Sequence, residues 1–138
     1  LPNGPLIGMR LDMLVELGRV TVDAVGDAVD TTYPILDVDA LGLSQVGPLK
    51  IVARAVEIVG LAGQPSFSLG TNGATANNQA GAQALTLTTD DDVEDLVMAS
   101  PSVQAIAGDV ITLRLIAQAA GTTTYSVELI VYGYHRRT

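Results

Sequence analysis

Residues 109–134 read DVITLRLIAQAAGTTTYSVELIVYGY and carry two strand-like patterns. Two alternating stretches flank a run of small and polar residues around Gly121. A period of two sends successive side chains to opposite faces of a strand. The pattern therefore predicts two strands joined by a hairpin-like loop. The inward-facing residues of the second strand are expected to be Tyr125, Val127, Leu129 and Val131.

The rest of the chain repeats strand patterns at short intervals, separated by turn residues. These further strands are expected at about 19–25, 35–41, 49–59, 66–70 and 85–88. Residues 42–48 are expected to form a loop. Residues 70–84 (GTNGATANNQAGAQA) are small and polar and cannot bury enough apolar surface to order themselves, so they predict a long exposed loop.

One segment predicts a short helix. Residues 88–101 read TTDDDVEDLVMASP, with Thr89 or Asp90 available as N-cap and acidic residues in the first turn. Pro101 follows the expected end of the helix.

Composition favours strands over helices. The 138 residues fit one domain, with 48% apolar but only 4% aromatic residues, 14 glycines and six prolines. About seven or eight strands, one short helix and no βαβ alternation predict an all-β sandwich or barrel. We expect residues 19–138 to form a single β-sandwich domain. Residues 1–18 are expected to form an N-terminal arm or the first element.

The N-terminal segment, residues 1–18, is densely apolar. It is compatible with a short helix and with an extended arm that lies on another subunit, and the sequence leaves both open. Its candidate contact residues are Leu6, Ile7, Met9, Leu11, Leu14 and Leu17.

Charge and composition exclude several classes of partner. The formal net charge is −8, so the surface repels nucleic acid on average. The longest apolar runs are too short to span a bilayer, so no membrane partner is expected. Without cysteine the chain forms no disulfide and no thiolate metal site.

Two sets of carboxylates could bind a metal ion. Residues 90–95 include Asp90, Asp91, Asp92, Glu94 and Asp95, and clustered carboxylates suit calcium. Their spacing does not match an EF-hand loop, so a solvated helix N-terminus is the favoured interpretation. Asp37 and Asp39 share one face of an expected strand, which favours a solvated face over a metal or proton-sharing pair. We expect no cofactor and no metal site.

The only histidine, His135, is the fourth residue from the end of the sequence. A catalytic histidine needs a nucleophile within reach, and the sequence contains neither a GxSxG motif nor a cysteine. A zinc site would usually require a second histidine. We expect no enzymatic activity. The residues at this end are instead expected to form a contact surface consisting of Tyr132, Tyr134, His135, Arg136 and Arg137.

Four stretches resemble bacteriophage virion proteins of jelly-roll type. They are PILDVDALG (34–42), GPLKIVARAVEIVG (47–60), SFSLGTNG (66–73) and GDVITLRLIAQAAGTTTYSVELIVYGY (108–134). They are similar to the capsid cement (decoration) proteins of short-tailed phages such as a Bordetella phage, and tail-fibre and tail-knob domains have similar endings. The resemblance implies a jelly-roll-like β-sandwich of about eight strands. It also implies self-association, attachment to the outside of an icosahedral head, and no cofactor or catalysis.

Three functions follow as hypotheses. The first is a virion protein on the outer capsid surface, whose partners are the major capsid protein and itself, as a homo-dimer or trimer. The alternative is a tail-fibre or tail-knob head domain that binds a host receptor or glycan. The third is an enzyme such as a sandwich-fold glycosidase, which would need two carboxylates across a cleft. The candidate carboxylates here are instead expected on surface strands and at a helix N-terminus.

Overall fold

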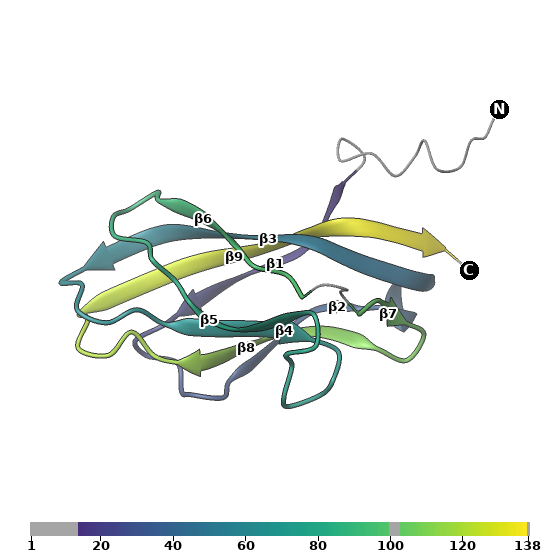
Figure 1. Cartoon of the computed structure of the whole chain (residues 1–138), viewed down its shortest axis with the longest axis horizontal. Helices are drawn as coiled ribbons and strands as arrows, with labels where there is room; N and C mark the ends of the chain where they lie inside the picture. The colour runs from purple at the N-terminus through teal and green to yellow at the C-terminus, as the bar shows by residue number, and fades with distance from the viewer. Residues whose placement is uncertain (1–13, 100–102, 138) are drawn as a thin grey trace.

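The computed structural model describes residues 14–99 and 103–137, which form nine strands in two antiparallel sheets packed face to face (Figure 1). The larger sheet has the order β1-β9-β3-β6, with β7 beside β3, and the smaller has the order β2-β8-β4-β5. The larger sheet contains β1 (Val15–Asp23), β9 (Thr124–Arg137), β3 (Leu43–Val59), β6 (Val93–Leu96) and β7 (Ala105–Ile106). The smaller contains β2 (Thr32–Asp37), β8 (Val110–Ala117), β4 (Ser66–Gly70) and β5 (Ala80–Ala84).

The strand pairing is that of a jelly roll. β1 pairs with β9, β2 with β8, β3 with β6 and β4 with β5, all antiparallel. Apart from the two-residue β7, the first strand therefore pairs with the last, the second with the next to last, and so on inward. Successive pairs alternate between the two sheets, which is an eight-stranded double-sheet jelly roll. The predicted all-β, jelly-roll-like sandwich is confirmed.

The core lies between the sheets and is mainly aliphatic. The predicted inward face of β9 is confirmed, because Tyr125, Val127, Leu129 and Val131 are all fully buried in the core cluster. The hydroxyl of Tyr125 donates to Oε1 of Gln64 at 2.7 Å, so the ring is buried with its polar group satisfied.

The expected hairpin around Gly121 is wrong. β8 belongs to the smaller sheet and β9 to the larger, so the connection crosses from one sheet to the other. Its side chains fix it to other loops: Thr122 Oγ1 accepts from the backbone N–H of Ala62 at 3.0 Å, and Gln118 Nε2 donates to the carbonyl of Asp27 at 2.7 Å. Strand alternation reveals which face is buried, but not which sheet the strand joins.

The expected loop at residues 42–48 is also wrong. β3 begins at Leu43 and pairs with the end of β9 along this whole stretch. Pro48 is tolerated because it lies opposite Gly133 at a register shift, where the ladder is already irregular. The preceding expected strand ends early, because Asp39–Leu41 forms a 3-10 turn, η3, closed by Gly42 at φ 66°.

The helix expected within residues 88–101 is a turn followed by the strand β6. β6 pairs with β3 over four residues, from Arg54 opposite Val93 to Ile51 opposite Leu96. These residues form a strand although their local sequence favours a helix. Pairing with the edge of β3 satisfies their backbone hydrogen-bonding groups and buries Leu96. The only helical element in the described residues is η3.

We expect Asp92→Asn to destabilise the fold in a pH-dependent way. Hydrogen bonds from the backbone N–H groups of Thr88 and Thr89 lower the pKa of Asp92 in the folded protein. A carboxyl group of this kind stabilises the fold above its unfolded pKa of about 3.9, and this stability is lost as the pH falls through the folded pKa. Urea unfolding should show a lower free energy of unfolding for the variant near neutral pH and no difference in strong acid. A difference independent of pH would contradict this role.

Residues 70–84 are not a long exposed loop throughout. They contain β5, and the loop before it is tied down by its own asparagines: Asn72 Nδ2 donates to Asn77 Oδ1 at 2.8 Å, and the N–H of Thr71 donates to Asn78 Oδ1 at 2.8 Å. Ala76 is fully buried. Hydrogen bonds therefore order a stretch that lacks the apolar residues to do so.

Candidate interaction surface

The larger sheet turns one face toward the core and the other away from it. In β9 the core residues Leu129 and Val131 alternate with Glu128, Ile130 and Tyr132, which therefore lie on the outer face. Directly opposed residues of paired strands share a face, so the register extends this surface across β1, β3 and β6. We call it the outer face.

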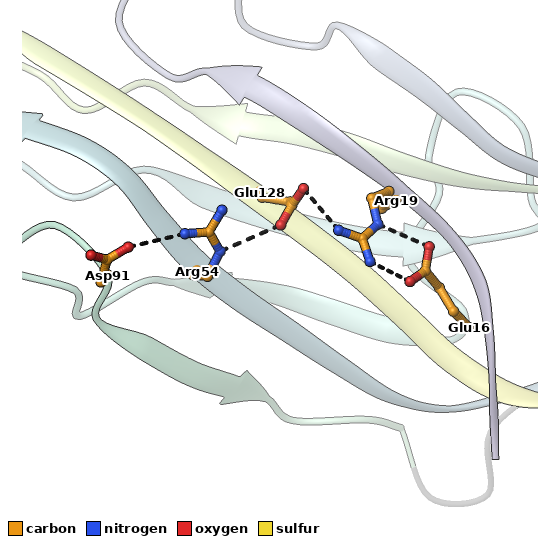
Figure 2. Close-up of polar contacts among 5 residues, drawn as sticks. All are labelled: Glu16, Arg19, Arg54, Asp91 and Glu128. Carbon is orange, nitrogen blue, oxygen red and sulfur yellow. Dashed lines mark hydrogen bonds and ion pairs between the residues drawn. The ribbon is translucent and has the colours of Figure 1, made fainter. Parts of the chain in front are cut away.

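Five charged side chains form a ladder across the outer face. Glu128 of β9 lies between two arginines, with Arg19 Nη1 at 3.2 Å and Arg54 Nε at 3.5 Å (Figure 2). Arg19 also binds Glu16 through two nitrogens, and Arg54 Nη1 lies 3.0 Å from Asp91 Oδ1. The charges alternate in sign along the ladder, so each arginine has a carboxylate on both sides.

The ion pairs within the ladder stabilise the charged forms of its side chains. Hydrogen bonds to Glu16 and Glu128 raise the pKa of Arg19, and the same contact with Arg19 lowers the pKa of Glu16. Glu128 is the least exposed member, with a side chain 14% accessible. Pairs as exposed as Arg19 with Glu16 contribute little to stability, so the ladder mainly fixes the shape and charge pattern of this face.

An isoleucine is buried on this outward side. Ile130 is only 7% exposed although it lies outside the core cluster. Its cross-strand neighbours are Arg19 on β1 and Val52 on β3. The aliphatic stem of an arginine can cover an apolar neighbour while its guanidinium stays in water.

The end of β9, with β3 and β7, forms a three-stranded tip. The phenol ring of Tyr134 lies against Gly47, where an added Cβ would come within 2.4 Å of the ring. The hydroxyl of Tyr134 accepts a hydrogen bond from Gln104 Nε2. Arg136 and Ile106 lie opposite the same β3 residue, so both belong to the outer face, and Ile106 is 57% exposed. The tip therefore combines aromatic, aliphatic and cationic side chains.

The expected cluster at residues 132–137 is divided between two faces. Tyr132, Tyr134 and Arg136 lie on the outer face, whereas His135 lies opposite the buried Val46 and faces the interior side. There it lines a cavity of about 150 Å³ at the open end of the sandwich. The other lining residues are Glu16, Leu17, Leu36, Leu41 and Leu43. Among the described residues, no serine, threonine or cysteine lines this cavity, so they offer His135 no hydroxyl or thiol nucleophile there.

The N-terminal contact residues are only partly described. Leu6, Ile7, Met9 and Leu11 lie outside the described residues. Leu14 is half-buried just before β1, and Leu17 lies within β1, where it packs against the core and lines the cavity. The side chain of Arg137 also lies outside the described part, although its backbone pairs with Leu43.

The opposite end of the outer face is acidic. Asp23 on β1 and Glu57 on β3 flank Ser126 of β9 in one cross-strand row. Nearby, Asp90 Oδ1 accepts from the backbone N–H of Ile58 at 2.9 Å. Exposed valines accompany these carboxylates; they are Val56, Val59 and Val93.

The carboxylates considered for calcium have separate structural partners. Glu94 accepts from the hydroxyl of Thr86 at 2.9 Å, and Asp95 Oδ2 lies 3.6 Å from Lys50 Nζ. Asp37 Oδ1 accepts from the N–H of Asp39 at 3.1 Å and shapes a turn. Within residues 14–99 and 103–137, no group of three or more His, Cys, Asp or Glu side chains could hold a metal ion.

The ladder was missed at the sequence level. The two-residue period sets Glu128 on the face opposite Val127 and Leu129, but its pairing with Arg54 depends on residues far apart in sequence. The register sets Arg54 opposite Glu128, and no local spacing encodes that register.

No helix of the described part is both long and apolar enough to cross a membrane.

Comparisons with known proteins establish a likeness of fold. No family model and no curated protein matches the chain. A chain of the cyanophage Pam1 capsid asymmetric unit is similar with a TM-score of 0.51 and 13% identity, over 88% of this chain and 84% of that one. A chain of the capsid of Ralstonia phage GP4 has a TM-score of 0.55 and 14% identity, over 91% of this chain and 83% of that one. The chain thus shares its fold with chains of two phage capsids.

Proposed function

We propose that this chain is a virion structural protein that binds the outside of an icosahedral phage head and cements neighbouring major capsid subunits. The observation that carries the proposal is the fold likeness, over 88% and 91% of the chain, to chains from two phage capsids. Its mechanism would be thermodynamic. A protein that binds only the assembled shell stabilises that state by mass action, and many symmetry-related copies strengthen attachment through multivalency.

Two elements supply the proposed contacts with other subunits. The first is the N-terminal segment, whose apolar residues Leu6, Ile7, Met9 and Leu11 precede β1 and are assigned to the shell. The second is the tip with Tyr132, Tyr134 and Arg136, since aromatic residues and arginine are enriched in interface cores.

The alternative of a glycan-binding tail domain has little support from the aromatic side chains. Sugar stacking needs exposed rings, but Phe67 and Tyr125 are fully buried. The hydroxyl of Tyr33 donates to Asp27 at 2.6 Å, and Tyr134 lies on Gly47. No observation favours this second function.

The position of the protein in an intact particle tests the cement role. We expect it on the head of purified virions, and we expect heads stripped of it to burst at lower heat or osmotic stress. Adding the protein back should restore their resistance. Location at the tail tip, or equal resistance of stripped heads, would refute the proposal.

Deleting residues 1–13 tests the shell contact while leaving β1 complete. The shortened chain should fold normally and bind stripped heads more weakly than the full chain. Unchanged binding would remove the N-terminal segment from the contact.

A further inference from the structure

We propose that the outer face of the larger sheet is a two-fold dimer interface between two copies of this chain. The inference concerns the purified chain, so it stands or falls independently of the virion role. It rests on three features of the outer face: a cationic end, an acidic end and a centre whose arginines already have carboxylate partners.

The cationic end is the tip. Ile106, Gln45 and Arg136 form one cross-strand row that contains a cation and no carboxylate. The guanidinium of Arg136 has no hydrogen bond or ion pair with any residue of the described ranges. The other cations whose side chains the structure describes each have a carboxylate within 4 Å; these are Arg19, Lys50, Arg54 and Arg114.

The acidic end is the row formed by Asp23, Ser126 and Glu57. This row contains two carboxylates and no cation. Asp23 Oδ1 already accepts from the N–H of Gly26 at 2.9 Å, whereas the exposed carboxylate of Glu57 has no partner among the described side chains and backbone groups. Glu57 and Arg136 are therefore two unpaired opposite charges at opposite ends of one face.

A two-fold rotation brings these two ends together. Ser126 and Arg136 are ten residues apart on β9, which corresponds to about 33 Å of strand. We place the two-fold axis in the plane of the interface, running across the strands near residue 131. This axis stacks the two outer faces and reverses the strand direction of the second copy. Arg136 of each copy then lies over Glu57 of the other, so both contacts form at once, as an isologous interface requires.

The centre of the face is compatible with exclusion of water. The ladder arginines already have carboxylate partners, so a second copy would not leave them unpaired. Val52 and Tyr132 are both partly exposed and provide apolar surface around the proposed axis. The strands β1, β9, β3 and β6, at about 3.3 Å per residue and about 4.8 Å between strands, present roughly 700 Å², close to the roughly 800 Å² per partner of a standard protein interface.

Charge reversal tests the proposal on the purified full chain. Sedimentation equilibrium should give twice the monomer mass of 14.3 kDa. Arg136→Glu and Glu57→Arg should each raise the dimer dissociation constant by about tenfold or more, because like charges then oppose each other. The double variant Arg136→Glu/Glu57→Arg should return close to the wild-type value, since each contact again joins opposite charges.

The matched control adds the same two negative charges elsewhere. Ala82→Glu/Ala120→Glu alters exposed residues of β5 and the 118–123 loop, away from the outer face, and should leave the dissociation constant unchanged. A monomeric wild type, or a double variant as weak as Arg136→Glu alone, would overturn the proposal. So would an Arg136→Glu variant that dimerises normally but no longer binds heads, because the tip would then bind a different protein.

The absence of cysteine allows a second, geometric test. Arg136→Cys and Glu57→Cys chains should each resist disulfide dimerisation alone, because equivalent positions lie far apart in the proposed dimer. An oxidised mixture of the two variants should form mixed dimers. Efficient cross-linking of Arg136→Cys with itself would indicate a tip-to-tip contact and refute this geometry.

Discussion

Replacing Phe67 with alanine is expected to destabilise the sandwich by about 3–5 kcal/mol. Phe67 is the only phenylalanine of the chain and is fully buried in β4, paired with Leu115 on β8 and Gln83 on β5. Its removal leaves a cavity in a core built mainly from smaller aliphatic side chains, which cannot fill the space of a ring without moving the strands. Domains of this size unfold at a cost of about 5–15 kcal/mol, so the loss is a large share of the total.

Equilibrium unfolding in urea measures this loss. The control is Val97→Ala, because Val97 is 75% exposed and its truncation should change the free energy of unfolding by less than about 0.5 kcal/mol. If Phe67→Ala changed it by less than about 1 kcal/mol, the assignment of Phe67 to a rigid core would be wrong.

Gly133→Ala is the second change with a large expected effect, at about 2–3 kcal/mol. A Cβ on Gly133 would lie 2.1 Å from the carbonyl oxygen of Gly47 and 2.9 Å from Cδ1 of Leu17. The first contact is with backbone and cannot be relieved by a rotamer change, so β9 would have to move away from β3 at the tip. The tip depends on that close approach, because Tyr134 lies on Gly47.

Gly81→Ala is the matched control for this substitution. No atom lies within 4 Å of a Cβ on Gly81, so alanine should be neutral there or stabilise by a few tenths of a kcal/mol through the unfolded chain. Thermal and urea unfolding of both variants separates a local clash from a general effect of losing glycine. Equal stability of the two variants would show that the backbone at the tip relaxes freely.

Several parts of the fold were predictable because their signal is local. The alternation of β9 identified Tyr125 and Leu129 as core residues, and the structure buries both completely. The same period placed Glu128 outward, where it joins the ladder. Ile130 is an apolar residue at a position where the period expects an outward-facing side chain, and it is buried on the outer face.

Other parts depended on contacts that no short window of sequence contains. Residues 93–96 have helix-compatible charges and a possible cap, yet they become a strand because β3 offers them an unpaired edge. The 70–84 stretch lacks apolar residues, yet Asn72 and Asn77 hold its loop in place by hydrogen bonds. The candidate surface depends on the fold in the same way, because the register sets Gln45 opposite Arg136 and no described carboxylate lies within ion-pair distance of it.

The sequence by itself determined that this chain is a β-sandwich and which residues of its clearest strands face inward. It could do so because a two-residue period is a property of each strand alone. Only the tertiary structure decided which strands are neighbours, where the two ends of β9 lie relative to the carboxylates of β1 and β3, and how the charges of Glu16, Arg19, Glu128, Arg54 and Asp91 join into one ladder. Register and sheet order arise from packing between distant segments, and the polarity of the outer face arises from register.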